Sequence, residues 1–196
     1  EVMIQNIDTL PIYTLTEEAK KAKQIRELSC EREWLVKERT RLKNQLHTLL
    51  HRIHNTNYRI KFKDPFSLKA MRYWMKSMPK SADAVLARRM KRAVRRLRDL
   101  RAEILEIEKE LAIMIEASGH TIVTANGCGT TLASEIIGEI GDIKRFKTPG
   151  ALAKYAGCAP RQHSSGKITR FRKTRSGNRR LNRAFHRMAL SQISRM

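Results

Sequence analysis

Hydrophobic residues recur every three or four positions along two long stretches of the chain. The first repeat runs from Ile25 to Ile53, and the second runs unbroken from Met90 to Met114. The first contains four leucines, each one heptad from the next: Leu28, Leu35, Leu42 and Leu49. This spacing is typical of the apolar seam of a coiled coil. The pattern predicts two long helices that either fold back as an antiparallel hairpin or pair with a second copy of the chain.

Details of these two stretches refine the prediction. Thr16 precedes two glutamates and is a plausible N-cap, whereas Ser81 and Gly119 can begin and end the second helix. Arg32 and Arg39 occupy seam positions, and two interpretations stay open. Their stems can pack while the head groups reach water, or they can face nucleic acid.

The segment between the two helices mixes aromatic and basic side chains. Its aromatic residues are Tyr58, Phe62, Phe66, Tyr73 and Trp74, interleaved with five lysines and arginines. Such aromatics can stack on unpaired bases. The alternative is a small core at the tip of the hairpin.

The part after residue 117 contains shorter elements. A short apolar helix runs into Gly127-Cys128-Gly129, and a second helix follows. This order suggests a helix-hairpin-helix, in which glycines allow a tight turn and the next helix presents N–H groups to a phosphate. We therefore assign Gly127, Gly129, Thr130 and Thr131 as DNA-binding candidates. A plain turn between two helices is the alternative.

Further along, residues 151–156 and 179–193 have helical patterns, and residues 161–175 suggest a basic β-ribbon or an irregular loop. The predicted fold is therefore mainly α, a long helical hairpin followed by a small helical domain. We expect a linker at residues 1–16, the coiled-coil hairpin at 17–117 and the C-terminal domain at 118–196.

Charge narrows the function. The chain has 41 Lys and Arg against 19 Asp and Glu, a formal net charge of +22. Residues 143–196 contain 15 basic residues and no acidic one. This excess disfavours an ordinary metabolic enzyme and predicts a nucleic-acid partner.

Other features exclude alternative environments. No apolar run approaches the roughly 18 residues needed to span a bilayer, so we expect no membrane partner. Cys30, Cys128 and Cys158 lie far apart, which is typical of reduced thiols in the cytoplasm. Three histidines at helical spacing lack a carboxylate or cysteine to complete a site, so no metal or other cofactor is predicted in this chain.

One short segment, Ser164-Ser165-Gly166-Lys167, is the candidate for chemistry. A serine ringed by basic groups is where attack on a phosphodiester would be placed, although this is also ordinary loop sequence. The surrounding residues complete the set of DNA-binding candidates: Lys167, Arg170, Arg172, Lys173, Arg175, Asn178, Arg179 and Arg180.

Three C-terminal motifs add up to a family resemblance. They are GCGTTLASEIIGEIGDIKRF, LAKYAGCAP, and SSGK followed by SGNRRLNRA. In this order they resemble the C-terminal domain of the IS110/IS116 insertion-sequence transposases, a group that includes the Piv DNA invertases. RELSCEREWLVKERTRLKNQLHTLL also resembles the coiled-coil region of that family.

The resemblance implies specific chemistry. Family members begin with a RuvC-like domain whose acidic residues bind divalent metal such as Mg²⁺. No residue here matches those carboxylates, and the chain starts at Glu1, so we expect a piece of a longer protein. The family's serine nucleophile corresponds to Ser165, with Ser164 as second choice. Relatives often have Arg where this chain has Asn182.

The resulting functional prediction is the DNA-binding and catalytic-serine portion of a transposase or site-specific recombinase that cuts and rejoins DNA. We expect a homo-oligomer held by the coiled coil, and a fragment that is inactive alone. Some relatives use a guide RNA, and the basic hairpin is compatible with one. The alternative is a non-catalytic coiled-coil, helix-hairpin-helix module that only binds nucleic acid.

Overall fold

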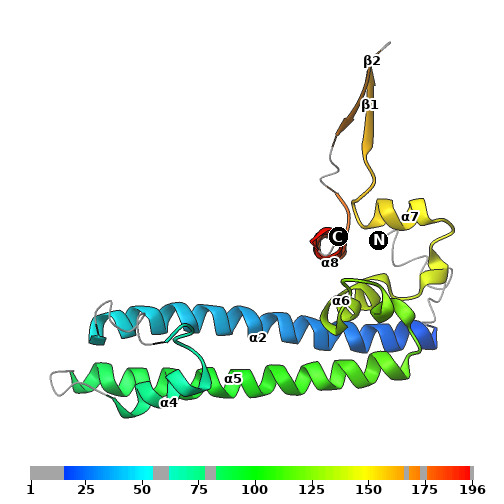
Figure 1. Ribbon diagram of the computed structural model, residues 1–196. Helices are drawn as coiled ribbons and strands as arrows, with labels where there is room; N and C mark the ends of the chain where they lie inside the picture. The colour runs from blue at the N-terminus through cyan, green and yellow to red at the C-terminus, as the bar shows by residue number, and fades with distance from the viewer. Residues whose placement is uncertain (1–15, 55–61, 78–82, 166–167, 173–175, 195–196) are drawn as a thin grey trace, which may run out of the picture. The chain divides into compact units, whose positions relative to one another are not determined.

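The computed structural model describes residues 16–54, 62–77, 83–165, 168–172 and 176–194. It is mainly helical, as predicted, with one short β-ribbon (Figure 1). The elements in chain order are α2 (Glu17–His54), α4 (Leu68–Lys76), α5 (Ala84–Ala117), the 3₁₀ helix η3 (Thr121–Thr124), α6 (Thr130–Ile140), the 3₁₀ helix η4 (Ile143–Arg145), α7 (Pro149–Tyr155), β1 (Arg161–Ser165), β2 (Ile168–Arg172) and α8 (Arg179–Ile193).

The chain divides into two compact units. One is the continuous segment Cys30–Ala112, here called the hairpin unit. The other combines Glu1–Ser29 with Ile113–Met196 and is called the C-terminal unit. The division cuts both α2 and α5, and the sequence-based boundary between residues 117 and 118 stays a prediction.

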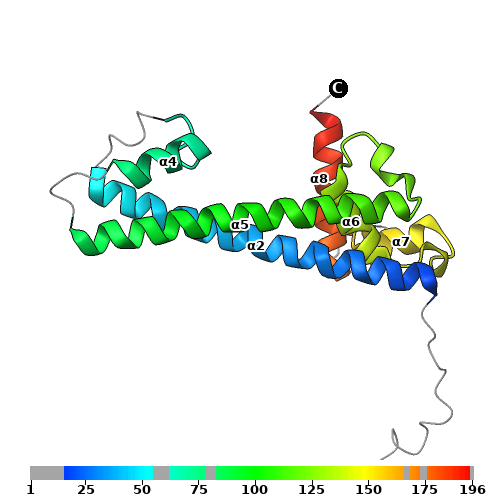
Figure 2. The same ribbon diagram turned by 90° about the horizontal axis from the view of Figure 1, so that it is seen from below.

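The hairpin unit is built on the two predicted heptad seams. Within it, the two long helices lie side by side (Figure 1 and Figure 2). The buried seam residues are Leu42, Leu46 and Leu49 on α2, and Met90, Leu97, Leu100, Ile104, Ile107 and Leu111 on α5. The seam of one helix therefore covers that of the other, and the predicted antiparallel hairpin is confirmed.

One seam arginine makes a contact that neither sequence interpretation anticipated. The Arg32 guanidinium lies 2.5 Å from Glu108 on α5, and only 19% of its side chain is exposed. Its Nε also donates to the same carboxylate oxygen at 2.7 Å. Arg32 therefore ties the two helices together rather than reaching water or nucleic acid.

The aromatic segment forms a small core on the hairpin. Phe66, Ala70, Met71 and Trp74 are buried against α2 and α5. The Trp74 indole Nε1 donates to the Pro65 carbonyl at 2.9 Å, which satisfies the polar atom of a buried ring. For Phe66 and Trp74 the small-core interpretation is therefore correct, and Tyr58 lies outside the described residues.

Local signals set the ends of the long helices. The Thr16 hydroxyl accepts from Ala19 N at 3.1 Å, as an N-cap does. At the start of α5, Asp83 Oδ1 accepts from Val85 N at 2.8 Å, whereas Ser81 lies outside the described residues. Gly119 follows the end of α5 at φ 71°, a conformation that glycine adopts without strain.

The C-terminal unit is centred on α6. Eight consecutive residues of this helix are buried, because the unit surrounds it on most sides. It packs against α8, which contributes the buried residues Leu181 and Ala184. At Gly138 an added Cβ would lie 2.7 Å from the Arg26 Cα, so the backbones of α6 and α2 touch there. A glycine is needed at that point because any side chain would force the helices apart.

Candidate nucleic-acid interface

The predicted serine segment lies in the β-ribbon. β1 and β2 are antiparallel, and Ser165 pairs with Ile168 while Ser164 pairs with Thr169. Ser165 and Ile168 therefore form the last pair of the ladder. Of the predicted DNA-binding residues, Lys167, Lys173 and Arg175 lie outside the described residues.

The register divides the ribbon into two faces. Residues directly paired in an antiparallel ladder share a face, and successive residues of a strand alternate between faces. Position 165 therefore shares its face with positions 161, 163, 168, 170 and 172. Position 164 shares the other face with positions 162, 169 and 171. Arg170 on the first face and Phe171 on the second are both exposed.

The two segments that lead into and out of the ribbon are joined by a hydrogen bond between their backbones. Asn178 N donates to the Tyr155 carbonyl at 2.8 Å. Gly157 and Gly177 both have positive φ, and a Cβ on Gly177 would lie 2.7 Å from Gly157 N. This close approach fixes the root of the ribbon. No pattern in the sequence indicated that Gly157 and Gly177 would lie together.

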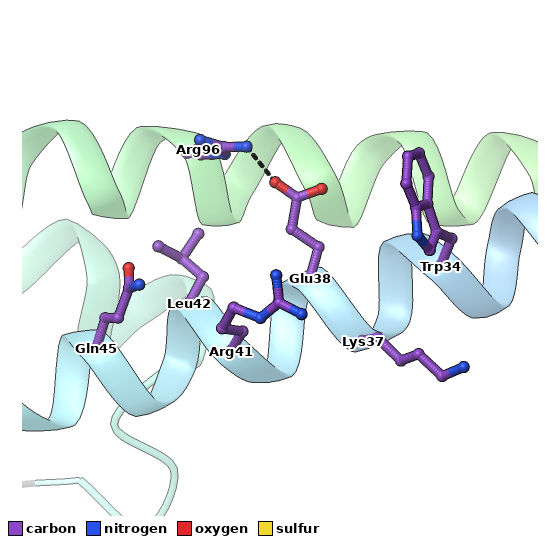
Figure 3. Close-up of a pocket in the computed structure, with 7 residues that line it drawn as sticks. All are labelled: Trp34, Lys37, Glu38, Arg41, Leu42, Gln45 and Arg96. Carbon is purple, nitrogen blue, oxygen red and sulfur yellow. Dashed lines mark hydrogen bonds and ion pairs between the residues drawn. The ribbon is translucent and has the colours of Figure 1, made fainter.

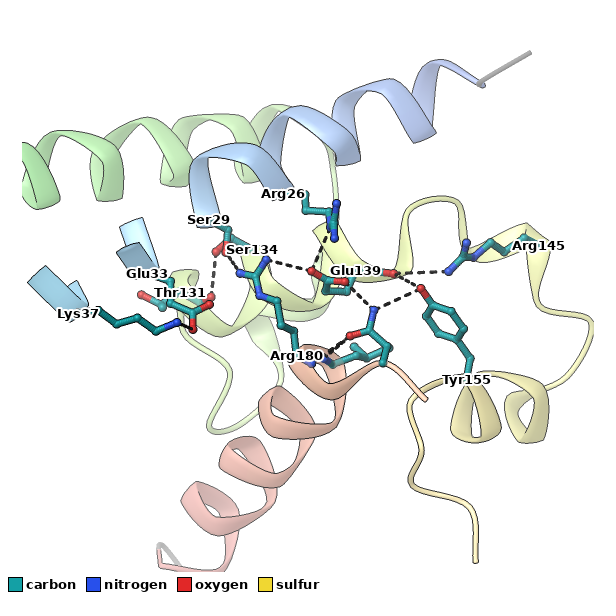
Figure 4. Close-up of polar contacts among 12 residues, drawn as sticks. Arg26, Ser29, Glu33, Lys37, Thr131, Ser134, Glu139, Arg145, Tyr155 and Arg180 are labelled. Atoms are coloured by element: carbon teal, nitrogen blue, oxygen red, sulfur yellow. Dashed lines mark hydrogen bonds and ion pairs between the residues drawn. The ribbon is translucent and has the colours of Figure 1, made fainter. Parts of the chain in front are cut away.

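A buried carboxylate lies beneath this root. Glu139 on α6 is 6% exposed, and its Oε1 accepts from Arg26 Nε at 3.1 Å and from an Arg180 guanidinium nitrogen at 3.0 Å (Figure 4). Its Oε2 accepts from Asn178 Nδ2 at 2.6 Å. Three donors compensate a buried charge that would otherwise be costly. Sequence reasoning did not identify Glu139.

The same network involves two predicted DNA-binding residues. Asn178 Oδ1 accepts from the backbone N–H groups of Arg180 and Leu181, which makes Asn178 the N-cap of α8. The side chains of Asn178 and Arg180 are therefore held by protein groups, whereas Arg179 is exposed. Their contact with DNA stays a prediction.

The glycine turn lies between η3 and α6. Gly127 has φ 80°, and its Cα region packs closely on α8, because a Cβ there would lie 3.0 Å from Ser191 Cβ. Gly129 is the N-cap of α6, and Thr130 and Thr131 form its first turn, half-buried. Between the glycines, burial raises the pKa of the Cys128 thiol above its ordinary value.

The element before this turn is shorter than the sequence suggested. It is η3, a single 3₁₀ turn of four residues with no buried side chain. The turn and α6 match the second half of the predicted motif. A helix-hairpin-helix stays a prediction.

Comparison with known protein families finds one match, in the C-terminal part of the chain. Residues 119–196 match the model of the transposase IS116/IS110/IS902 family. The match covers 78 of the 196 residues and supports an IS110-type transposase C-terminal region over that stretch. No curated protein and no solved structure shows a significant match to the chain.

The matched region begins at Gly119, just after the end of α5, and includes the glycine turn, the Glu139 carboxylate and the ribbon. The three motifs that carried the sequence resemblance all fall inside it. The coiled-coil segment that also resembles the family lies outside the matched residues.

In the described parts of the matched region and the hairpin unit, no three His, Cys, Asp or Glu side chains gather as a metal site would require. Over the same ranges, no helix combines the length and apolarity needed to cross a bilayer.

Proposed function

We propose that this chain is the DNA-binding and catalytic-serine portion of a transposase that cuts and rejoins DNA, with Ser165 as the nucleophile. One observation supports this choice above the others. The register puts Ser165 in the last pair of the ribbon and on the face of positions 163, 170 and 172, which are His, Arg and Arg. One face of the ribbon therefore combines a serine with basic residue types, which is the composition that attack on a phosphodiester calls for.

The register also favours Ser165 over Ser164. Ser164 shares its face with Gln162, Thr169 and Phe171, which carry no positive charge. A developing negative charge on phosphate is stabilised by positioned cations. The serine on the arginine face therefore has the better environment for attack.

The proposed step exchanges one phosphate ester bond for another. The Ser165 Oγ forms a bond to phosphorus, one bridging P–O bond of the DNA backbone breaks, and the leaving oxygen takes up a proton. The serine proton passes to a base, and the strand remains attached as a phosphoserine diester. Attack by a free DNA hydroxyl on that diester rejoins a strand and releases the serine.

Activation of the serine needs more than this chain provides. A serine hydroxyl is a weak nucleophile at neutral pH. Among the residues that the structure describes, no group of His, Cys, Asp and Glu side chains is placed to hold a metal ion. In the family resemblance, a RuvC-like domain would supply Mg²⁺ and lower the barrier to attack.

The decisive experiment replaces each serine in a protein that joins this chain to that RuvC-like domain. We expect Ser165→Ala to abolish strand cleavage and the covalent protein–DNA adduct while DNA affinity changes less than about twofold, because the cations that bind phosphate remain. Ser164→Ala is the matched control and should retain cleavage. Reactions with and without added cellular RNA separate an RNA-guided from an RNA-independent form.

Two outcomes would contradict the proposal. An adduct on Ser164 in the Ser165→Ala protein would move the role by one residue. Full cleavage with both serines replaced would leave the chain as a nucleic-acid-binding module.

A further inference from the structure

A groove on the hairpin unit lies far along the sequence from the ribbon. It consists of two adjoining hollows of about 440 and 490 Å³ between α2 and α5, which share Leu42, Gln45 and Arg96. The α2 side is a stripe at helical spacing: Trp34, Lys37, Glu38, Arg41, Gln45, Thr48, Leu49 and Arg52. The α5 side is Arg89, Arg92, Ala93 and Arg96. We call this surface the hairpin groove.

The hairpin groove is strongly cationic. Its lining contains six Lys or Arg side chains and one acid, Glu38. Arg96 of α5 pairs with Glu38, as Figure 3 shows, and Lys37 pairs with Glu33 at 3.0 Å. Within the ranges that the structure describes, no ion pair is found for the remaining arginines, which are Arg41, Arg52, Arg89 and Arg92. The one acid of the lining, Glu38, is paired with Arg96, so the surface keeps an excess of positive charge and is complementary to a polyanion.

The length of the groove suits a run of phosphates. Positions 34 to 52 of α2 are 18 residues apart, which is about 27 Å at the helical rise. Surfaces that bind single strands cover about 4–16 nucleotides, so a groove of this length would hold a short segment.

An aromatic side chain stands at one end of this row of charges. Trp34 is 75% exposed, although tryptophan is generally among the more buried residues. Figure 3 shows it on α2 one turn from Glu38. An exposed indole beside cations is the arrangement that stacks on a base while the phosphates are bound. In a duplex the faces of the bases are covered by their neighbours, so the arrangement favours an unpaired base.

We propose that the hairpin groove binds single-stranded DNA, with Trp34 stacked on one base and the arginines of α2 and α5 on the phosphates. The choice of DNA rests on the proposed function, since strand cutting and rejoining expose unpaired DNA. A second copy of the chain is the main rival occupant. In a two-fold dimer formed through this surface, two grooves of the same positive charge would face each other, and their repulsion opposes pairing.

The test measures binding of a dye-labelled oligothymidine of about twelve nucleotides to the 196-residue chain by fluorescence anisotropy. Trp34→Ala should weaken binding about tenfold, the effect of losing one base–aromatic stack. Intrinsic fluorescence gives a second readout. Saturating oligonucleotide should quench Trp34 in the wild type, whereas the buried Trp74 leaves the variant's emission nearly unchanged.

Matched controls come from the same unit. Leu105→Ala removes another exposed apolar side chain that does not line the groove, and should leave affinity unchanged. Arg92→Ala should weaken binding and reduce the salt slope, whereas Arg98→Ala, whose side chain pairs with Asp99, should do neither. All four substitutions are at exposed positions, so each variant should fold.

Three results would overturn the inference. The first is equal affinity of Trp34→Ala and wild type. The second is a loss of self-association in Trp34→Ala, by sedimentation, with affinity for the oligonucleotide retained. The third is binding of an RNA of the same sequence with no binding of the DNA. Cleavage by Ser165 is measured separately, so a failure here leaves the proposed function standing, and a failure there leaves this binding measurable.

Discussion

Glu139 is the residue on which the C-terminal unit depends most visibly. It links Arg26, Asn178 and Arg180, which come from α2, the segment before α8 and α8 itself. Residues so far apart in sequence leave no periodic pattern, so the sequence could not predict the network. Its one local sign was a carboxylate within a helix that is otherwise mostly apolar. By contrast, seam residues such as Leu46 and Leu111 were predictable because burial there follows a local spacing.

Removing the Glu139 carboxylate should be strongly destabilising. Glu139→Ala removes the buried carboxylate that pairs with Arg180, whose side chain is 21% exposed, and such a loss costs about 3–5 kcal/mol of unfolding free energy. Urea unfolding followed by circular dichroism measures the change. Glu139→Gln, which keeps one acceptor oxygen, should lose less. Glu116→Ala, at an exposed site on α5, should change stability by less than about 0.5 kcal/mol. An equal effect of the two alanine variants would contradict this account.

At the scale of elements, capping and periodicity determined what the sequence could predict. The last helix was predicted at 179–193, which the structure confirms, because Asn178 and the apolar spacing mark it locally. The ribbon was one of two alternatives for residues 161–175, since weak alternation alone does not establish strand pairing. The 3₁₀ helix before the glycine turn was predicted as an ordinary short helix, because an apolar run does not show how many turns it completes. The packing of α6 on α2 was not predicted, since it depends on the absence of a side chain at Gly138.

The contact at Gly138 gives a test of that packing. Gly138→Ala gains about 1 kcal/mol of helix propensity, but its Cβ would lie 2.7 Å from the Arg26 backbone. Overpacking against a backbone costs about 1–3 kcal/mol, so the net effect should be a lower melting temperature. Gly150→Ala on α7 is the control, because the nearest atom to an added Cβ there is the Thr148 Oγ1 at 3.8 Å. The melting temperature of this variant should rise. A Gly138→Ala protein at least as stable as wild type would show that the two helices can separate at no cost.

The whole molecule is dominated by its charge, which the sequence predicted without any structure. The formal net charge is +22, and the 54 residues from 143 carry 15 of the cations and no acid. The apolar seam of α5 is occupied by α2 of the same chain, so the hairpin accounts for it without a second copy. A homo-oligomer therefore stays a prediction, and light scattering over a range of concentrations measures it.

Binding of duplex DNA should depend steeply on salt. Each phosphate neutralised contributes about −0.9 to the slope of log affinity against log salt. Arg170→Ala, which removes an exposed cation of the ribbon, should make the slope less negative by about 1. The Trp34→Ala variant should keep the wild-type slope. Affinity that does not respond to salt would contradict binding through the backbone phosphates.

The discontinuous C-terminal unit has a consequence for how the protein is made. Its first segment ends at Ser29 and its second begins at Ile113, so 83 residues are translated between them. At ribosomal speeds of about 5–20 residues per second, the interval is roughly 4 to 17 s. During that time Ala22 and Ile25, which are buried in the finished unit, have no partners to cover them. A nascent chain that stops before residue 113 carries this apolar surface uncovered, which makes it a substrate for chaperones and proteases.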